Sequence, residues 1–361
     1  MDRGSEYQSA AAHLFLSEKI MRKLLLALPF VSGYACADIK VSGILDIAYE
    51  VATSGGETVE RFTGAGLSAN RVQLKIQENL SDDISILGIY EAMYRPHSDD
   101  DIGQREAFAQ ITSQRFGTLS IGRQDTPSAN AYGYADPLFG NEYSLVNNVA
   151  VFYAPWREDR SLMYISPRIE GFQFRGMATQ GERDGSRNGR VYSISLDYWN
   201  DSPWYFSIAM DRKYQRNLWD RDTIEQSTDI YLTSVYSIEN TDFTAILHRY
   251  SGYYAYAPWV DFESSGNDLQ LGIRHNFGNK HNIAASLIYK NDDNNDALSD
   301  AAGINLGYIY NYRQNIDLYG VYGYIHHQSN TDIRYPISWN LDSPLTDENP
   351  QGVQLGFRLK F

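Results

Sequence analysis

The sequence has almost no cysteine and no long apolar run, and each absence excludes a class of protein. Cys36 is the single cysteine among 361 residues, so a fold held by several disulfides is excluded. Beyond the N-terminal region no stretch of about 18 or more apolar residues occurs, which excludes a bundle of membrane-spanning helices. Cations are also in deficit, since 31 Lys and Arg face 45 Asp and Glu and give a formal net charge of -14. No nucleic-acid partner is therefore expected.

The N-terminal region has the features of an export signal. Residues 21–37 contain a basic start (MRK), an apolar core and a small-residue cleavage site (ACA). Cleavage after Ala37 leaves Asp38 as the first residue of the mature chain. Residues 1–20 precede a better start and are interpreted as a mis-assigned N-terminal extension. Residues 38–361 contain no linker, so we expect one domain.

What is abundant is aromatic residues and a two-residue alternation. The chain holds 28 Tyr, and 14% of its residues are aromatic. This content is typical of the aromatic girdles of a membrane barrel, with a Tyr-rich soluble β protein as the alternative. In the final stretch VQLGFRLKF, ending at Phe361, apolar residues alternate with polar residues or glycine. Such a terminal strand needs a partner, and pairing with the first strand of the mature chain closes a barrel.

Reading this alternation from end to end predicts sixteen strands. They are expected at 39–51, 70–78, 84–95, 105–113, 118–123, 161–165, 172–180, 190–199, 204–213, 228–238, 242–250, 267–277, 281–290, 303–312, 316–327 and 351–361. Short turns alternate with longer polar loops such as 52–69 and 251–266, which is the asymmetry of an outer-membrane barrel. The predicted fold class is all-β, a 16-stranded antiparallel transmembrane β-barrel around an aqueous channel.

Several segments carry a family resemblance. KVSGILDIAYE resembles the first strand of the general porins of the Gram-negative outer membrane, and SANRVQLKIQENL resembles their second strand and first turn. REAFAQITSQRFGTLSIGRQDTP, LMYISPRIEGFQF and the ending LGFRLKF resemble their fourth to seventh and last strands. The resemblance implies a homotrimer of barrels. It also implies an inward-folded third external loop carrying acidic residues, opposite arginines on the wall.

Three arginines are the candidate basic residues of the pore constriction. By this resemblance Arg71 and Arg123 match basic wall positions, and Arg157 is the third candidate. Arg71 and Arg157 lie opposite the apolar rows of their strands, so both should point into the lumen. Arg123 shares its parity with the apolar row, and a bulge at Gly122 is needed to turn it inward. Arg160 is the runner-up to Arg157. The alternative for each is a solvated residue at the rim.

The candidate acidic residues of the constriction are Asp136, Glu142 and Glu91. The inward loop is expected at 124–148, and its segment NAYGYADPLFGNEY resembles the acidic loop of the family. Asp136 matches the first acidic position, whereas Leu138 stands where many members have Glu. Glu142 could restore that charge, and Glu91 has lumen parity on the third strand. An ordinary surface turn is the alternative for this loop.

The resemblance predicts an outer-membrane porin for passive diffusion of ions and small hydrophilic solutes. A substrate-specific channel, for example for an oligosaccharide, is the alternative, followed by a barrel enzyme or an adhesin. The one histidine pair, His326-His327, points to opposite faces of a strand, and no nucleophile-base motif or metal cluster appears. No enzyme, cofactor or metal is therefore predicted. Expected partners are outer-membrane lipids, lipopolysaccharide and the outer-membrane assembly machinery, which in the family reads the last strand ending at Phe361.

Overall fold

The computed structural model describes residues 37–95, 103–138, 140–150, 154–182, 185–257, 260–293, 300–328, 334–338 and 349–361. The described residues from Ile39 to Phe361 belong to one compact unit, which is a β-barrel. The expected extension 1–20 and nearly all of the expected signal peptide 21–37 lie outside the described residues. Within the described part of the chain, no helix has the length and apolar character needed to cross a membrane.

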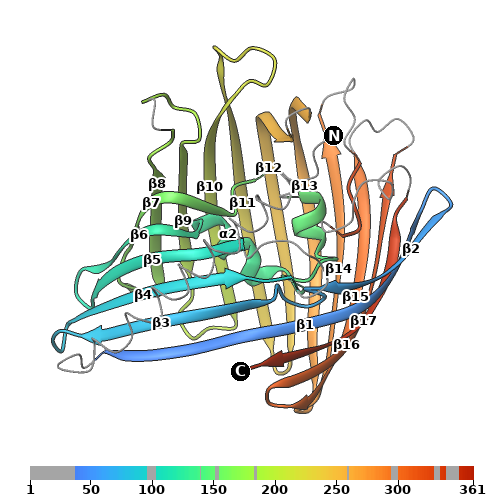
Figure 1. Ribbon diagram of the computed structural model, residues 1–361, viewed down its shortest axis with the longest axis horizontal. Coiled ribbons are helices and arrows are strands. Elements are labelled where there is room, and N and C mark those ends of the chain that lie inside the picture. Colours follow the sequence, from blue (N-terminus) through green and yellow to red (C-terminus); the bar gives the residue numbers. More distant parts are fainter. Residues whose placement is uncertain are drawn as a thin grey trace, which may run out of the picture. The chain divides into compact units, whose positions relative to one another are not determined.

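Almost all of the described chain is strand (Figure 1). The strands are β1 (Asp38–Ser54), β2 (Glu57–Gly64), β3 (Arg71–Asn79), β4 (Ile84–Met93), β5 (Gly103–Ser113), β6 (Gly117–Asp125), β7 (Arg157–Ile165), β8 (Phe172–Thr179), β9 (Val191–Tyr198), β10 (Trp204–Arg216), β11 (Ile224–Ile238), β12 (Thr241–Ala257), β13 (Val260–Phe277), β14 (His281–Asp292), β15 (Ala301–Arg313), β16 (Ile316–His327) and β17 (Gln351–Lys360). The helices are α2 (Pro127–Ala135) and the π-helix η2 (Val146–Ala150).

The alternation of each strand separates an apolar outer face from a polar inner face. In β9, Tyr192, Ile194 and Leu196 are 44%, 45% and 43% exposed, whereas the intervening Ser193 and Ser195 are buried. Polar side chains thus face the interior and large apolar side chains face outward, which is the arrangement of a barrel whose outer surface contacts lipid. This inversion explains how a sequence of polar average composition forms a membrane protein.

The described strands form one antiparallel sheet that closes on itself. The sheet contains seventeen strand segments, and β1 pairs with both β3 and β2 along its length. β2 and β3 therefore share one position in the barrel, which leaves sixteen strand positions. The last strand pairs with the first over a register from Ile44↔Lys360 to Thr53↔Gln351. The predicted 16-stranded barrel and the pairing of its two terminal strands are confirmed.

The interruption between β2 and β3 is held by one buried carboxylate. Asp46 of β1 accepts hydrogen bonds from the backbone N–H groups of Leu67 (3.0 Å) and Ser68 (2.9 Å). The Tyr319 hydroxyl of β16 donates a hydrogen bond to the same carboxylate. The bend thus exchanges ladder hydrogen bonds for bonds to a side chain, so its backbone donors keep partners.

Two expected loops are in fact extended hairpins. Residues 52–69 contain the end of β1 and the whole of β2, because Gly55 and Gly56 adopt φ values of 57° and 82° and make a two-residue turn. Residues 251–257 continue β12 and residues 260–266 belong to β13, with Gly252 opposite Ser264. The expectation of long polar loops was wrong at both places, since loop length was inferred from the apolar row alone and these hairpins continue past it.

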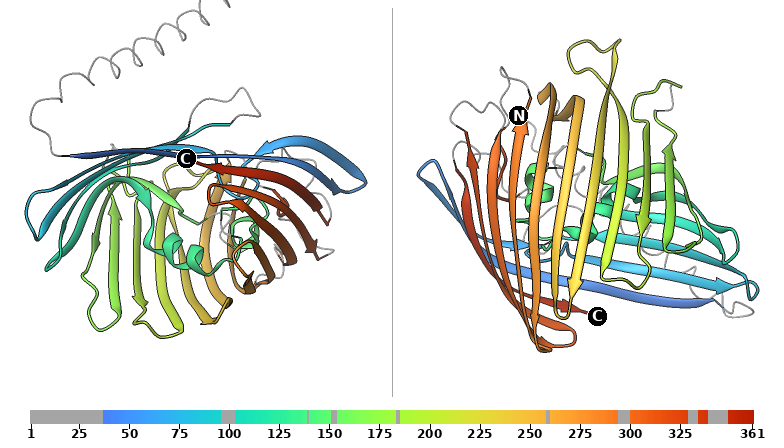
Figure 2. Two further views of the ribbon diagram at one scale, coloured as in Figure 1. Left: turned by 90° about the horizontal axis from the view of Figure 1, so that it is seen from below. Right: turned by 180° about the vertical axis from the view of Figure 1, so that it is seen from behind.

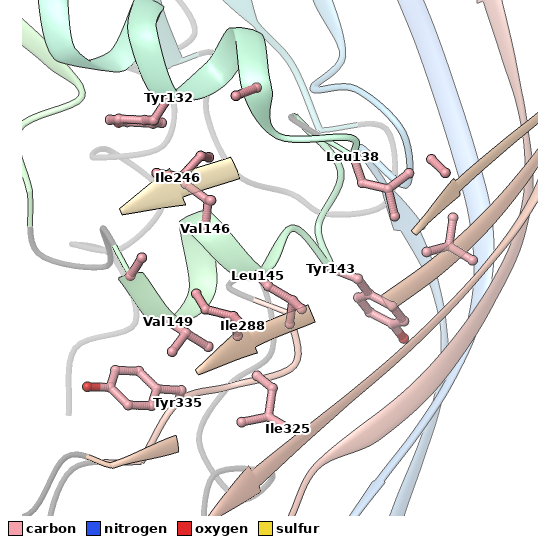
Figure 3. Packing of buried hydrophobic residues seen from close by; sticks show 14 of the residues in the cluster. Tyr132, Leu138, Tyr143, Leu145, Val146, Val149, Ile246, Ile288, Ile325 and Tyr335 are labelled. Carbon is pink, nitrogen blue, oxygen red and sulfur yellow. The ribbon is translucent and has the colours of Figure 1, made fainter. Parts of the chain in front are cut away.

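The connection between β6 and β7 contains both helices of the described chain. Its side chains pack against those of the strands, and Figure 2 shows α2 within the ring of strands. In Figure 3, Tyr132, Leu145 and Val146 of this connection lie close to Ile246 of β12 and Ile288 of β14. The hydrophobic core of the barrel is therefore the contact between this segment and the inner face of the sheet.

Candidate functional site

The segment 126–150 follows the inner face of the barrel. Thr126 caps α2 by accepting a hydrogen bond from the backbone of Ala129, and Pro127 fits the first helical turn, where no N–H is needed. Ser128 donates to Asp211 of β10 at 2.5 Å. Further along, Asn305 of β15 donates to the backbone carbonyl of residue 143 at 2.9 Å. The segment is thus anchored from β10 round to β15.

Asp136, the first predicted acidic residue, is buried against the wall. Its side chain is part of a residue only 1% exposed, and its oxygens accept hydrogen bonds from Ser144 Oγ (2.5 Å) and Gln270 Nε2 (3.0 Å). Burial raises the pKa of this carboxyl above its ordinary value, although both hydrogen bonds oppose the rise. The Asp136 side chain therefore points from the loop toward the wall, where the hydrogen bond from Gln270 anchors the loop to β13.

Glu142 is also buried and joins distant parts of the chain. Its oxygens accept hydrogen bonds from Thr63 Oγ1 of β2 (2.8 Å) and Gln354 Nε2 of β17 (2.8 Å). Ser338 Oγ donates to it at 3.2 Å, and an Arg61 nitrogen lies 4.0 Å away. This position differs from the expected lumen-facing charge. The reason is that its partners come from segments far apart in sequence, which no local pattern brings together.

Leu138, which stands where many family members have Glu, packs between the loop and the inner face of the strands. It is 3% exposed, and a Cβ added at Gly307 of β15 would lie only 2.8 Å from its side chain. An apolar residue suits this position because the loop approaches the strand closely there. Of the three predicted acids, only Glu91 lies on the wall opposite the loop.

Glu91 bridges two arginines on neighbouring strands. Its carboxylate lies 3.4 Å from Arg71 Nε and 2.6 Å from Arg105 Nε, and it accepts a hydrogen bond from Gln73 at 3.0 Å. The Arg71 and Arg105 side chains keep 28% and 16% exposure, compared with 7% for Glu91. The parity prediction for Arg71 thus agrees with its pairing on the inner face.

Arg157 belongs to the same group of charges. Its Nε lies 2.7 Å from Asp125, its guanidinium lies 5.1 Å from the ring centre of Trp156, and its side chain is 14% exposed. Arg71 interacts electrostatically with both Arg105 and Arg157. We call Arg71, Arg105 and Arg157 with Glu91, Glu106 and Asp125 the charged wall. It holds three guanidinium groups and three carboxyl groups.

Arg123 lies apart from these contacts. The register of β6 and β7 shifts between Gly122 and Gln124, and Gly122 has a φ of 138°, so the predicted bulge is present. However, the Arg123 guanidinium pairs with Asp159 at 3.0 Å, and the Asp159 side chain is 64% exposed. The bulge turns Arg123 toward an exposed ion pair rather than toward Glu91. Arg160, the runner-up, has a φ of 51° in the same irregular stretch.

Arg105 was missed by the sequence reasoning. It lies at a register shift, since Glu91 pairs with Glu106 whereas Ala92 pairs with Gln104. Strand parity cannot assign a face to a bulged residue. The available signal was charge complementarity, because Glu91 of lumen parity needed a cation on an adjacent strand. Among the described residues, no group of three or more acidic, His or Cys side chains could hold a metal ion.

Comparison with known proteins gives consistent results. A family described as Gram-negative porin matches residues 24–330. The fold resembles the anion-selective porin of Comamonas acidovorans, at 17% identity and a TM-score of 0.76 over 90% of this chain and 100% of that one. OmpF of Salmonella typhi (15%, 0.65, 90% and 97%) and the trimer form of OmpT of Vibrio cholerae (14%, 0.62, 91% and 100%) are also similar. No curated protein sequence matches.

Proposed function

The chain belongs to the Gram-negative porin family, and on this premise we propose that the charged wall determines which ions its channel passes. The protein is an outer-membrane channel for passive diffusion of ions and small hydrophilic solutes. The closed barrel with a lipid-facing apolar surface provides the channel. Selection then depends on the charges that remain accessible in the narrowest part.

The relative exposure of the charged wall supports a weak preference for anions. The Arg71 and Arg105 guanidinium groups keep contact with water, whereas Glu91 lies beneath them. In the remaining pair the Asp125 side chain is 29% exposed and that of Arg157 14%, which offsets part of this difference. The loop acids Asp136 and Glu142 are buried and hydrogen-bonded, so permeating ions do not contact them directly. The preference is weak because three carboxylates compensate three guanidinium groups. The resemblance to an anion-selective porin agrees with this proposal.

Reversal potentials across a planar bilayer under a salt gradient test the assignment. We expect Arg71→Ala and Arg157→Ala each to shift the reversal potential toward cation preference, because each removes one positive charge from the charged wall. Arg115→Ala is the matched control, since Arg115 lies in the turn between β5 and β6. Unchanged potentials in both wall variants would remove the assignment. Absence of any conductance would contradict the channel itself.

A substrate-specific channel is the second candidate. It differs from a diffusion channel in one measurable property, which is saturation of the current or flux as solute concentration rises. A diffusion channel should show a current that rises linearly with salt concentration and a sugar flux that rises linearly with the concentration of added neutral sugar. Because the family is one of channels, we propose no enzymatic activity.

We propose that the protein assembles as a homotrimer, as the similar OmpT of Vibrio cholerae does in its trimer form. Lipids would contact the outward apolar band, lipopolysaccharide would contact the external loops, and the assembly machinery would read the strand that ends at Phe361. Electrophoresis without heating, compared with heated samples, tests the trimer. A species at the monomer mass under both conditions would contradict it.

We further propose that export removes residues 21–37. The short apolar core and the small residues before Asp38 support this assignment. N-terminal sequencing of the protein from outer membranes should begin at Asp38. A mature protein that begins at Met1 or Met21 would contradict the assignment.

A further inference from the structure

A buried histidine lies between two carboxylates on the side of the barrel opposite the charged wall. His248 of β12 is 1% exposed, and its Nδ1 lies 2.7 Å from Asp268 Oδ2 of β13. Its Nε2 lies 3.0 Å from Asp229 Oδ1 of β11. Both carboxylates belong to residues that are 1% exposed. Neither the porin fold nor the charged wall accounts for this arrangement.

The geometry indicates the protonation state of the ring. A neutral imidazole carries one N–H, so it can donate to one carboxylate and would point a lone pair at the other. A doubly protonated ring donates to both Asp229 and Asp268 and compensates their charges. Burial makes an unpaired carboxylate costly, so the ionic form satisfies the most groups.

His248 is one of two cations in a row that crosses five strands. Asp211 of β10 pairs in register with Asp229, and one oxygen of each carboxylate has no hydrogen-bond partner. Lys290 of β14 lies 3.1 Å from Asp268. Asp229 and Asp268 flank the His248 ring, and loss of the imidazolium proton would leave only Lys290 to balance these two carboxylates.

Tyrosines surround the charged groups of this row. Tyr254 donates to Asp229 at 3.3 Å, and Lys290 lies 3.8 Å above the ring of Tyr250 and 5.7 Å from that of Tyr335. Tyr231 stacks on the His248 ring with centroids 4.5 Å apart and 4° between planes.

The same row supports α2. Tyr132 of α2 contacts Tyr231, with ring centroids 5.3 Å apart, and Tyr231 lies directly on His248. Ser128, in the first turn of α2, donates to Asp211 at 2.5 Å. Two side chains of the helix thus rest on the row whose charge balance includes His248.

We propose that His248, as an imidazolium, is a positioning residue that holds α2 against the wall and so fixes the opening beside the charged wall. The proposal rests on the proposed role of that wall in the channel. When His248 loses its proton, repulsion between Asp229 and Asp268, which no longer have a cation between them, loosens the support of α2. The channel then closes transiently more often.

Nitrogen NMR on protein labelled with ¹⁵N-histidine tests the protonation state directly. We expect both ring nitrogens of His248 to be protonated at pH 7, where a free imidazole, which titrates near pH 6.5, is mostly neutral. Contacts with Tyr231 identify its signals without any mutation. One unprotonated ring nitrogen at pH 7 would overturn the proposal, whatever the arginine variants show.

Single-channel recording tests the positioning role. In His248→Gln we expect closures about tenfold more frequent than in the wild type at pH 7, in line with the loss of a charge-assisted hydrogen bond. Wild-type closures should increase at alkaline pH, whereas the variant should lose this dependence. His248→Gln with Asp229→Asn should restore steady current, because it removes the excess carboxylate together with the cation.

His275→Gln is the matched control, since His275 of β13 bonds to the neutral Thr241 hydroxyl. Lower thermal stability of His248→Gln with an unchanged closure rate and pH profile would show a merely structural role and contradict the proposal. If His248→Gln does not fold, the NMR result on the wild type still decides it.

Discussion

At the scale of single residues, Glu91 determines how much of the charge of the arginines remains available. Arg71 and Arg105 both contact its carboxylate, and Gln73 donates a further hydrogen bond. One acid therefore compensates parts of two guanidinium groups. Because the Glu91 side chain itself is only 7% exposed, its main effect on permeating ions is to offset the positive charge of Arg71 and Arg105.

Neutralising this acid should strengthen anion preference. We expect Glu91→Gln to raise the anion-to-cation permeability ratio about fivefold, since one unit charge contributes about 1 kcal/mol at 4 Å in water. Reversal potentials under a salt gradient measure the ratio. Glu60→Gln is the control, because Glu60 lies on β2 and accepts a hydrogen bond from Tyr49 at an exposed position. A shift toward cations in Glu91→Gln would contradict the described compensation.

Asp136 should make stability depend on pH. Burial raises the pKa of its carboxyl in the folded protein above the ordinary value of 3.8, so folding favours the protonated form. The contribution of the Asp136 proton to the free energy of unfolding is fully present below about pH 3.8 and is lost as pH rises through the folded pKa. We therefore expect Asp136→Asn to match the wild type in acid and to gain relative stability as pH rises, measured by thermal unfolding.

Asp220 provides the opposite case in an exposed loop. The Thr223 hydroxyl lowers the pKa of its carboxyl, so the stability that the ionised Asp220 contributes is fully present above the ordinary value and is lost as pH falls through the folded pKa. Asp220→Asn should therefore lose relative stability as pH rises toward the ordinary value and keep that deficit above it. If both variants shift in the same direction with pH, the assignment of the two carboxyls is wrong.

At the scale of elements, close approach between the loop and the strands depends on missing side chains. A Cβ added at Gly272 would overlap Pro137, and one added at Gly352 would overlap the Tyr143 hydroxyl. Tyr143 is fully buried and donates to Glu50 of β1 at 2.7 Å. Glycine at these positions lets the loop lie directly on the backbone of the wall.

Adding one methyl group at this contact should displace the loop. We expect Gly352→Ala to change single-channel conductance and to destabilise the protein by about 1–3 kcal/mol, the usual cost of overpacking. Gly88→Ala is the matched control, because a Cβ there meets nothing within 4 Å. Equal conductance in Gly352→Ala and the wild type would show that Tyr143 does not position the loop.

The elements also show what the sequence could predict. Strand alternation located the sixteen barrel positions, because it depends only on neighbouring residues. Parity also assigned Arg71 and Glu91 to the same face, and the two side chains lie 3.4 Å apart. The partners of Glu142 could not be predicted, since Thr63, Ser338 and Gln354 come from three separate segments. Arg105 was missed because a bulge breaks the parity on which the prediction relied.

At the scale of the whole molecule, the two ends of the barrel chain meet. Backbone hydrogen bonds join Gly43 and Phe361 in both directions, at 2.8 and 3.1 Å, and a Cβ on Gly43 would overlap the Phe361 ring. The terminal residue is thus fixed beside the first strand. Its ring is also 58% exposed, so a second molecule can reach it before or after closure.

Phe361→Ala should separate assembly from function. We expect less trimer in the outer membrane of cells, because the proposed recognition of the terminal ring is lost, but ordinary conductance for protein refolded in detergent. Phe357→Ala is the matched control, since Phe357 is an outward-facing ring of the same strand. Equal losses in both variants would show that only the apolar area of the strand matters.

The pairing of β1 with β17 also has a kinetic consequence. Residues 44 and 360 of this pair are 316 positions apart, so bringing them together costs about 5 kcal/mol of chain entropy by the logarithmic loop rule. The last ladder of the barrel cannot form until the whole chain has emerged, and until then two strand edges remain open. The slowest and most aggregation-prone stage of folding should therefore be the final one, in which the chain needs protection by other proteins.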